Sequence, residues 1–125
     1  LVNDFRRAHQ IELSLVVRGF GGVAVPAEQA LAVFRIIQEA LSNTAKHAGA
    51  TSVSLVMETD RQKVKVSVED NGDGFDTDAQ TGRGNGLWSM RDRALLLGGK
   101  FDVESVAGRG TTVFASIPIT EASAS

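Results

Sequence analysis

The chain has 125 residues and a net charge of −2, and hydrophobic residues make up 42% of it. This length suits a single domain, and the apolar fraction is sufficient for a buried core, which excludes a globally disordered chain. Acidic and basic residues are spread along the sequence, without the basic stripe that proteins binding nucleic acid or membrane surfaces normally show. The lack of cysteine excludes disulfides and thiolate metal sites.

The sequence gives no sign of a membrane span or a signal peptide. It begins at Leu1 without a methionine, and we interpret it as a fragment of a longer protein. We expect residues 1–10 to be the remnant of a preceding helix, residues 11–119 to form one domain and residues 120–125 to be a tail.

The first half of this domain is predicted to hold a strand, a long helix and a hairpin. Residues 11–18 are rich in β-branched and aliphatic side chains, which favours a strand. Residues 27–48 follow a helical period after Pro26. The strands 51–58 and 63–69 alternate apolar and polar residues, which predicts a hairpin with one buried face. The apolar face of the helix is predicted to comprise Ala30, Val33, Phe34, Ile37, Leu41, Ala45 and Ala48.

The second half begins with a glycine-rich loop from Asp70 to Asn85. A helix over 86–97 and a second hairpin of strands 100–105 and 110–117 follow. This order predicts an α+β fold, a two-layer α/β sandwich with a mixed, mainly antiparallel sheet and helices on one face.

A polar triplet lies on the long helix, away from its predicted apolar face. Glu39, Asn43 and Lys46 are spaced i, i+4 and i+7, within an arc of about 60° at 100° per residue. A carboxylate, an amide oxygen and an ammonium group could together hold a hydrated Mg²⁺ ion and its phosphates. The alternative is an ordinary solvated helix face.

The segment Asp70-Asn71-Gly72-Asp73-Gly74-Phe75 directly follows a strand that should be buried. The aspartate would be presented beside glycine backbone that a flat ligand can approach closely. A plain turn is one alternative. A calcium loop of the EF-hand type is a poorer one, because Gly72 and Gly74 stand where oxygen ligands are needed.

The segment Gly82-Arg83-Gly84-Asn85-Gly86 runs into the second helix, and backbone amides at such a junction suit phosphate oxygens. It matches neither the dinucleotide-binding fingerprint nor the P-loop, since Leu87 replaces the third glycine and no Gly-Lys-Ser/Thr occurs.

Four segments resemble, in order and spacing, the nucleotide-binding boxes of the GHKL superfamily with its Bergerat-type fold. They are RIIQEALSNTAKHA (35–48), DNGDGF (70–75), GRGNGL (82–87) and GRGTT (108–112). The superfamily groups type II topoisomerases, certain chaperones, mismatch-repair ATPases and histidine kinases. The resemblance is strongest to sensor histidine kinases that act with NarL-type response regulators, and it is carried by the segments QEALSN, KHA and GLWSMRDRA.

The resemblance implies binding of ATP with Mg²⁺. Asn43 is expected to coordinate the metal, Glu39 to act near the metal or its water, and Lys46 to reach a phosphate. These three residues are also the expected catalytic set.

The base and lid contacts are likewise implied by the resemblance. Asp70 is expected to accept a hydrogen bond from the adenine amino group, and Thr111 to support it through a water. The remaining nucleotide-binding residues are expected to be Gly72 and Gly74 at the base, Gly84 and Gly86 in the lid, and Leu87 and Thr112.

As a whole, the resemblance implies a domain that transfers the γ-phosphoryl group of ATP to a histidine on a separate dimerisation domain, and acts on a NarL-type response regulator only indirectly. The expected location is the cytoplasmic part of a membrane-anchored sensor, with no direct membrane or nucleic-acid contact. Neither His9 nor His47 has the setting of a phospho-acceptor, so the fragment alone is not expected to phosphorylate itself. The alternatives are a serine kinase of the anti-sigma-factor type and an ATP-driven clamp of the topoisomerase type.

Overall fold

The computed structural model describes residues 11–19, 24–46, 50–73, 87–106 and 108–119, except for the side chains of Lys46, Leu87 and Trp88. The expectations for residues 1–10 and 120–125 therefore lie outside the described residues. The elements follow the predicted order to within one or two residues. They are β1 (Glu12–Arg18), α2 (Ala27–Lys46), β2 (Ser52–Thr59), β3 (Lys63–Asp70), α3 (Leu87–Leu96), β4 (Lys100–Val106) and β5 (Gly110–Pro118).

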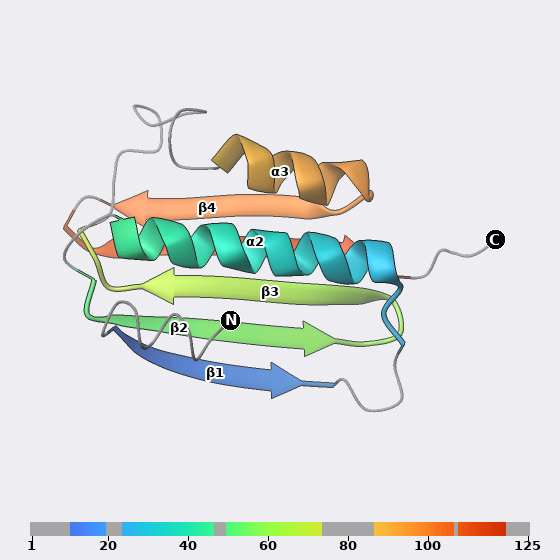
Figure 1. Cartoon of the computed structure of the whole chain (residues 1–125), viewed down its shortest axis with the longest axis horizontal. Helices are drawn as coiled ribbons and strands as arrows, with labels where there is room; N and C mark the ends of the chain where they lie inside the picture. The colour runs from blue at the N-terminus through green and yellow to red at the C-terminus, as the bar shows by residue number, and fades with distance from the viewer. Residues whose placement is uncertain (1–10, 20–23, 47–49, 74–86, 107, 120–125) are drawn as a thin grey trace.

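The strands form one mixed sheet in the order β1-β2-β3-β5-β4. Strands β1 and β2 are parallel, and every other neighbouring pair is antiparallel. Helices α2 and α3 lie side by side on one face of the sheet (Figure 1). The predicted fold class and both predicted hairpins are confirmed. No helix among the described residues is long and apolar enough to cross a membrane.

The face of the sheet that carries the helices is built from rows of side chains that run across the strands. Three rows are almost entirely apolar, because alternate residues of each strand point to the same side. A fourth row, at one end of the sheet, is apolar on β1 and β2 but polar on the other strands. In the order β1-β2-β3-β5-β4 this row is Leu13, Val53, Asp70, Thr111 and Ser105. The polar side chains therefore lie where the core ends.

The buried face of α2 differs from the predicted one. Phe34 is 42% exposed and Ala30 is also exposed, whereas Ile36 and Ala40 are buried. Asn43 continues this buried face, since it lies seven residues after Ile36, and it is only 9% exposed. The prediction that Asn43 lies away from the packed side was therefore wrong. Counting apolar residues alone placed the centre of the face on the Phe34 side, because polar Asn43 and Thr44 were not counted as core.

Local sequence explains two of the turns. After helix α3, Gly98 has a φ of 77° and its amide donates to the carbonyl of Leu95 (3.0 Å). The amide of Gly99 donates to the carbonyl of Ala94 (2.8 Å), and together these contacts form a Schellman motif. Between β2 and β3, the carboxylate of Asp60 accepts hydrogen bonds from the amides of Gln62 (2.7 Å) and Lys63 (3.0 Å). These hydrogen bonds hold the pKa of Asp60 below its ordinary value.

Candidate functional site

Several elements end at the same side of the molecule. The C-terminal ends of α2, β3 and β4 and the N-terminal end of β5 lie at the left of Figure 1, and the N-terminal end of α3 points to the same side. The polar row of the sheet is at this end, because Asp70 is the last residue of β3 and Thr111 is the second residue of β5. The fold thus brings together residues that are distant in the sequence.

The carboxylate of Asp70 is the centre of this cluster. Its Oδ1 accepts hydrogen bonds from the amides of Gly72 (2.9 Å) and Thr111 (3.3 Å). Its Oδ2 accepts a hydrogen bond from the hydroxyl of Thr44 (3.2 Å). Asp70 is half-buried, so its carboxylate is held in place by these contacts while part of the residue stays accessible.

Thr44 lies on α2, next to Asn43, and is 3% exposed. Sequence reasoning missed it as a site residue, because a threonine in a helix gives no signal of its own. The one available signal is that Thr44 directly follows Asn43 and lies seven residues after Ile37, on the buried side of the helix.

Thr111 and Thr112 point to opposite faces of the sheet. Thr111 shares its face with Asp70 and Ser105, and its hydroxyl lies 2.7 Å from that of Ser105. Thr112 is paired with Glu69 and Glu104 on the face away from the helices. The strand pleat therefore directs the Thr112 side chain away from Asp70. Thr111 lies beside Asp70, but it contacts the carboxylate through its amide, while its hydroxyl, expected to support Asp70, lies next to that of Ser105.

Two glycines allow the backbone to approach Asp70. A Cβ atom on Gly72 would lie 3.2 Å from Asp70 Oδ1 and 3.3 Å from Ala50 Cβ, which is tighter than most such contacts. A Cβ atom on Gly110 would lie 2.2 Å from the carbonyl oxygen of Asp70. Gly72 was among the predicted residues, but Gly110 was not, although it belongs to the GRGTT segment.

Asn71, by contrast, has a structural role. Its side-chain oxygen accepts hydrogen bonds from the amides of Thr51 and Ser52, both at 2.9 Å, and its amide group donates to the Thr51 hydroxyl at 2.9 Å. Asn71 thereby ties the end of β3 to the beginning of β2, next to Asp70.

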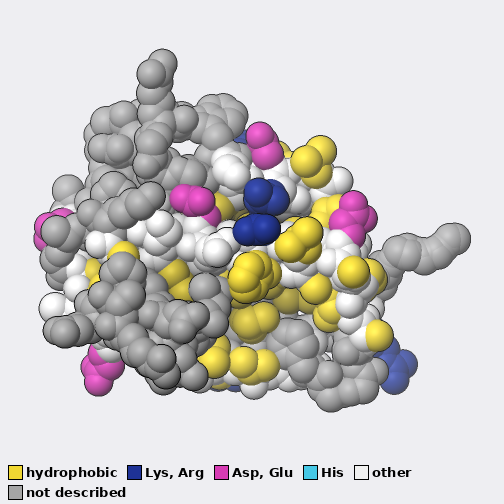
Figure 2. Space-filling model, in the orientation of Figure 1, with side chains coloured by type: hydrophobic (Ala, Val, Ile, Leu, Met, Phe, Trp, Pro, Cys, Tyr) yellow, Lys and Arg dark blue, Asp and Glu magenta, His cyan; other side chains and the backbone are white. Residues whose placement is uncertain are grey.

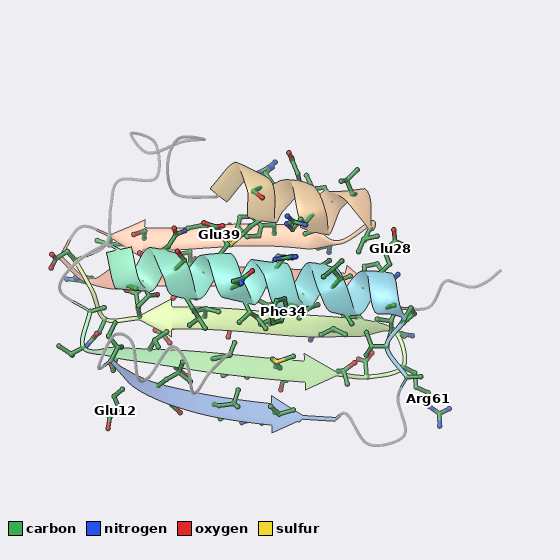
Figure 3. The ribbon with its side chains drawn as sticks, viewed as in Figure 1. Glu12, Glu28, Phe34, Glu39 and Arg61 are labelled. Atoms are coloured by element: carbon green, nitrogen blue, oxygen red, sulfur yellow. The ribbon has the colours of Figure 1, made fainter. Side chains whose placement is uncertain are left out.

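The predicted metal and phosphate residues are only partly described. Glu39 is half-buried one helical turn before Asn43 and lies on the side of α2 that faces α3 (Figure 3). Phe34, on the other side of the helix, does not face this region (Figure 3). The side chain of Lys46, Gly74, Gly84, Gly86 and the side chain of Leu87 lie outside the described residues.

A separate groove lies between α2 and the strands β1 and β2. It has a volume of about 310 Å³, and its described lining is entirely apolar, including Leu15, Val17 and Phe34. Figure 2 shows hydrophobic side chains gathered on this face of the molecule. None of the described lining residues carries a polar side chain that could bind a phosphate or a metal, so the candidate site within the described part of the chain is the cluster around Asp70.

Comparison with known proteins identifies the family of this chain. Residues 28–121 match the family described as "Histidine kinase-, DNA gyrase B-, and HSP90-like ATPase". The chain belongs to this family. The matched region includes α2, Asp70 and the β4–β5 hairpin, and therefore the whole described part of the candidate site.

Relatives of the chain include two bacterial histidine kinases. The chain is 39% identical over 99 residues to the signal transduction histidine-protein kinase/phosphatase DegS of Brevibacillus brevis, with 79% of this chain and 26% of that protein covered. It is 34% identical over 119 residues to the sensor histidine kinase LiaS of Bacillus subtilis (strain 168), with 95% of this chain and 32% of that protein covered. The chain thus spans about a quarter to a third of the length of these relatives.

Solved structures of histidine kinases share the fold. The catalytic domain of histidine kinase ThkA superposes with a TM-score of 0.73 at 20% identity, covering 94% of this chain and 84% of that one. A blue-light activated histidine kinase of Erythrobacter litoralis superposes with a TM-score of 0.71 at 23% identity, covering 96% of this chain and 40% of that one. The five-stranded sheet with helices on one face is the common architecture.

Proposed function

We propose that this chain is the Mg·ATP-binding catalytic domain of a sensor histidine kinase, and that Asp70 recognises the adenine base. The observation that carries the proposal is the position of Asp70 at the end of β3. Its carboxylate accepts hydrogen bonds from the amides of Gly72 and Thr111 and from the hydroxyl of Thr44. Membership of the ATPase family supports ATP as the nucleotide.

The hydrogen bonds of Asp70 suit an adenine amino group. A carboxylate offers about four acceptor positions, and the described residues fill three of them. The remaining position can accept an N–H donor, as the amino group of adenine provides. Guanine has a carbonyl oxygen at the same place, which would face the carboxylate without a hydrogen between them. Glycine at position 72 lets the backbone pass close to the carboxylate, where a Cβ atom would lie 3.2 Å from Oδ1.

The side chains proposed to bind the metal and the phosphates have the chemical groups that Mg·ATP requires. Asn43 and Glu39 would offer oxygen ligands one helical turn apart, close to Asp70 through the neighbouring Thr44. Lys46, Gly74, Gly84, Gly86 and Leu87 complete the proposed set, on the evidence of the sequence pattern. Mg²⁺ would neutralise phosphate charge, and the chain's own residues would orient the nucleotide.

The relatives suggest the biological setting. DegS and LiaS are named as a histidine-protein kinase/phosphatase and a sensor histidine kinase, respectively. We propose that the domain delivers the γ-phosphoryl group to a histidine on a dimerisation domain of the same protein, which then serves a NarL-type response regulator. We further propose that the domain works in the cytoplasm as part of a membrane-anchored sensor.

Calorimetric titration with nucleotide tests the assignment of Asp70. We expect the chain to bind ATP or ADP in the presence of Mg²⁺ and to bind GTP at least tenfold more weakly, since an unsatisfied buried polar group costs about 1–3 kcal/mol. Asp70→Asn should weaken ADP binding about 10- to 100-fold, because its amide group would face the adenine donor. Equal affinity for ATP and GTP in the unaltered chain would contradict the proposal.

A further inference from the structure

We propose that Thr44 is a positioning residue that orients the carboxylate of Asp70 and thereby sets the selectivity of the site for a purine with a 6-amino group. This inference rests on the proposed function, since it assumes that Asp70 recognises the base. It assigns a role to a helix residue outside the predicted nucleotide-binding residues.

The two oxygens of the Asp70 carboxylate have different hydrogen-bond partners. Oδ1 receives two backbone amides, from Gly72 and Thr111, so both of its acceptor positions are in use. Oδ2 receives one hydrogen bond, from the Thr44 hydroxyl. Among the contacts of the described residues, the remaining acceptor position of the carboxylate is therefore on Oδ2, and the Thr44 hydroxyl determines its direction.

The position of Thr44 makes its hydroxyl a firm support. The residue is 3% exposed, so water cannot readily replace its hydrogen bond. Its hydroxyl also lies 3.2 Å from the carbonyl oxygen of Ala40, one turn earlier in α2. A hydroxyl has a single proton, so the contacts with Ala40 and Asp70 share it. The hydroxyl is thus confined between the helix backbone and Asp70, and it fixes the distance between α2 and the end of β3.

Loss of this hydroxyl should leave Oδ2 with two open acceptor positions. The carboxylate would then be held through Oδ1 alone, so Oδ2 could shift as far as the two amide hydrogen bonds to Oδ1 allow, since this last side-chain torsion is soft. The acceptor would no longer be aimed at one place, and the advantage of a ligand that brings an N–H donor would fall. A ligand without that donor would lose nothing, because it never used the acceptor.

Thr44→Val tests this directly, since valine keeps the branched shape and removes the hydroxyl. Affinities for ADP and for inosine diphosphate, which has a carbonyl oxygen in place of the 6-amino group, are measured by calorimetry with Mg²⁺. We expect Thr44→Val to weaken ADP binding about tenfold and to leave the weaker inosine diphosphate binding unchanged. Thr44→Ser restores the hydroxyl and should recover ADP affinity to within about threefold of the unaltered chain.

Thr59→Val is the matched control. Thr59 is also a buried threonine, 7% exposed, and its hydroxyl donates to backbone carbonyls of Asp60 and Lys63 at the opposite end of β3. It should lower stability as Thr44→Val does, without altering either affinity. If Thr44→Val weakens both nucleotides equally, Thr44 acts only through stability and the inference is wrong.

The failure of this inference is distinguishable from failure of the proposed function. Absence of ADP binding by the unaltered chain, or equal binding of ADP and inosine diphosphate, would overturn the role of Asp70 and the inference together. A preference for ADP that Asp70→Asn abolishes and Thr44→Val preserves would overturn the role of Thr44 alone.

Discussion

At the residue scale, two asparagines near Asp70 have the same chemistry and different surroundings. Asn71 is exposed, yet its side chain makes three hydrogen bonds to the beginning of β2. Asn43 is buried on α2 and is the proposed metal ligand. Asn71 therefore supports the strand ends, whereas a role of Asn43 at the nucleotide remains part of the proposed function.

Replacement of Asn71 should therefore affect stability more than nucleotide binding. Asn71→Ala removes all three hydrogen bonds, and we expect the free energy of unfolding to fall by about 1–2 kcal/mol, because water can partly replace partners at an exposed site. Asn71→Asp keeps the acceptor for Thr51 and Ser52 and should lose less. Urea denaturation measures both, and an unchanged unfolding midpoint for Asn71→Ala would contradict the structural role.

The sequence singles out Asp70 as a candidate site residue but gives no indication of Thr44, for a physical reason. An aspartate at the end of an alternating strand, followed by glycines, stands out in the sequence, although a plain turn can produce the same pattern. A threonine inside a helix is common and gives no indication of its partner, which is 26 residues away in the sequence. The polar triplet and the resemblance to a family motif point to Asn43, but they do not predict its burial. A helical wheel that places only apolar residues on the buried face assigns Asn43 to the solvent side.

At the scale of elements, the β4–β5 hairpin shapes the site through its glycines. Gly108 and Gly110 both have positive φ, 83° and 110°. The surroundings differ, since a Cβ on Gly108 would meet nothing within 4 Å and one on Gly110 would lie 2.2 Å from the Asp70 carbonyl oxygen. The sequence marks both as turn glycines, and only the packing of β5 against β3 separates them.

Alanine at these two positions should therefore have unequal effects. Gly108→Ala carries only the backbone penalty of positive φ, about 1 kcal/mol. Gly110→Ala adds an overlap with backbone that cannot rotate away, so we expect more than about 2 kcal/mol of destabilisation and a loss of ADP affinity. Thermal unfolding and calorimetry of the two variants provide the comparison. Equal melting temperatures would show that the hairpin relaxes around the added methyl group.

At the scale of the molecule, the sequence predicts the elements, the two hairpins and the fold class, but not the order of the strands in the sheet. Alternation in 51–58, 63–69, 100–105 and 110–117 predicts two hairpins, and both are present. The parallel pairing of β1 with β2 and the contact of β3 with β5 join segments far apart in the chain, and short-range periodicity carries no information about them. These long-range pairings create the row containing Asp70, Thr111 and Ser105, so the site is a product of topology as much as of motif.

If this chain binds the nucleotide and a separate domain carries the phospho-accepting histidine, as proposed, the chain alone should not become phosphorylated. The chain has two histidines, His9 and His47, and in the sequence neither has the setting of a phospho-acceptor. Incubation with γ-labelled ATP and Mg²⁺ should therefore leave the chain unlabelled, even at concentrations that saturate binding in calorimetry.

A histidine-bearing acceptor domain of the proposed kind, added in trans, should become labelled slowly, because the high effective concentration of a covalent link is missing. The label should be lost in acid, as expected for a phosphohistidine, and Asp70→Asn should reduce its rate together with nucleotide affinity. Acid-stable label on a serine would instead support the anti-sigma-factor type of kinase. Acid-labile label on the isolated chain would show that His9 or His47 is an acceptor, and would contradict the need for a separate domain.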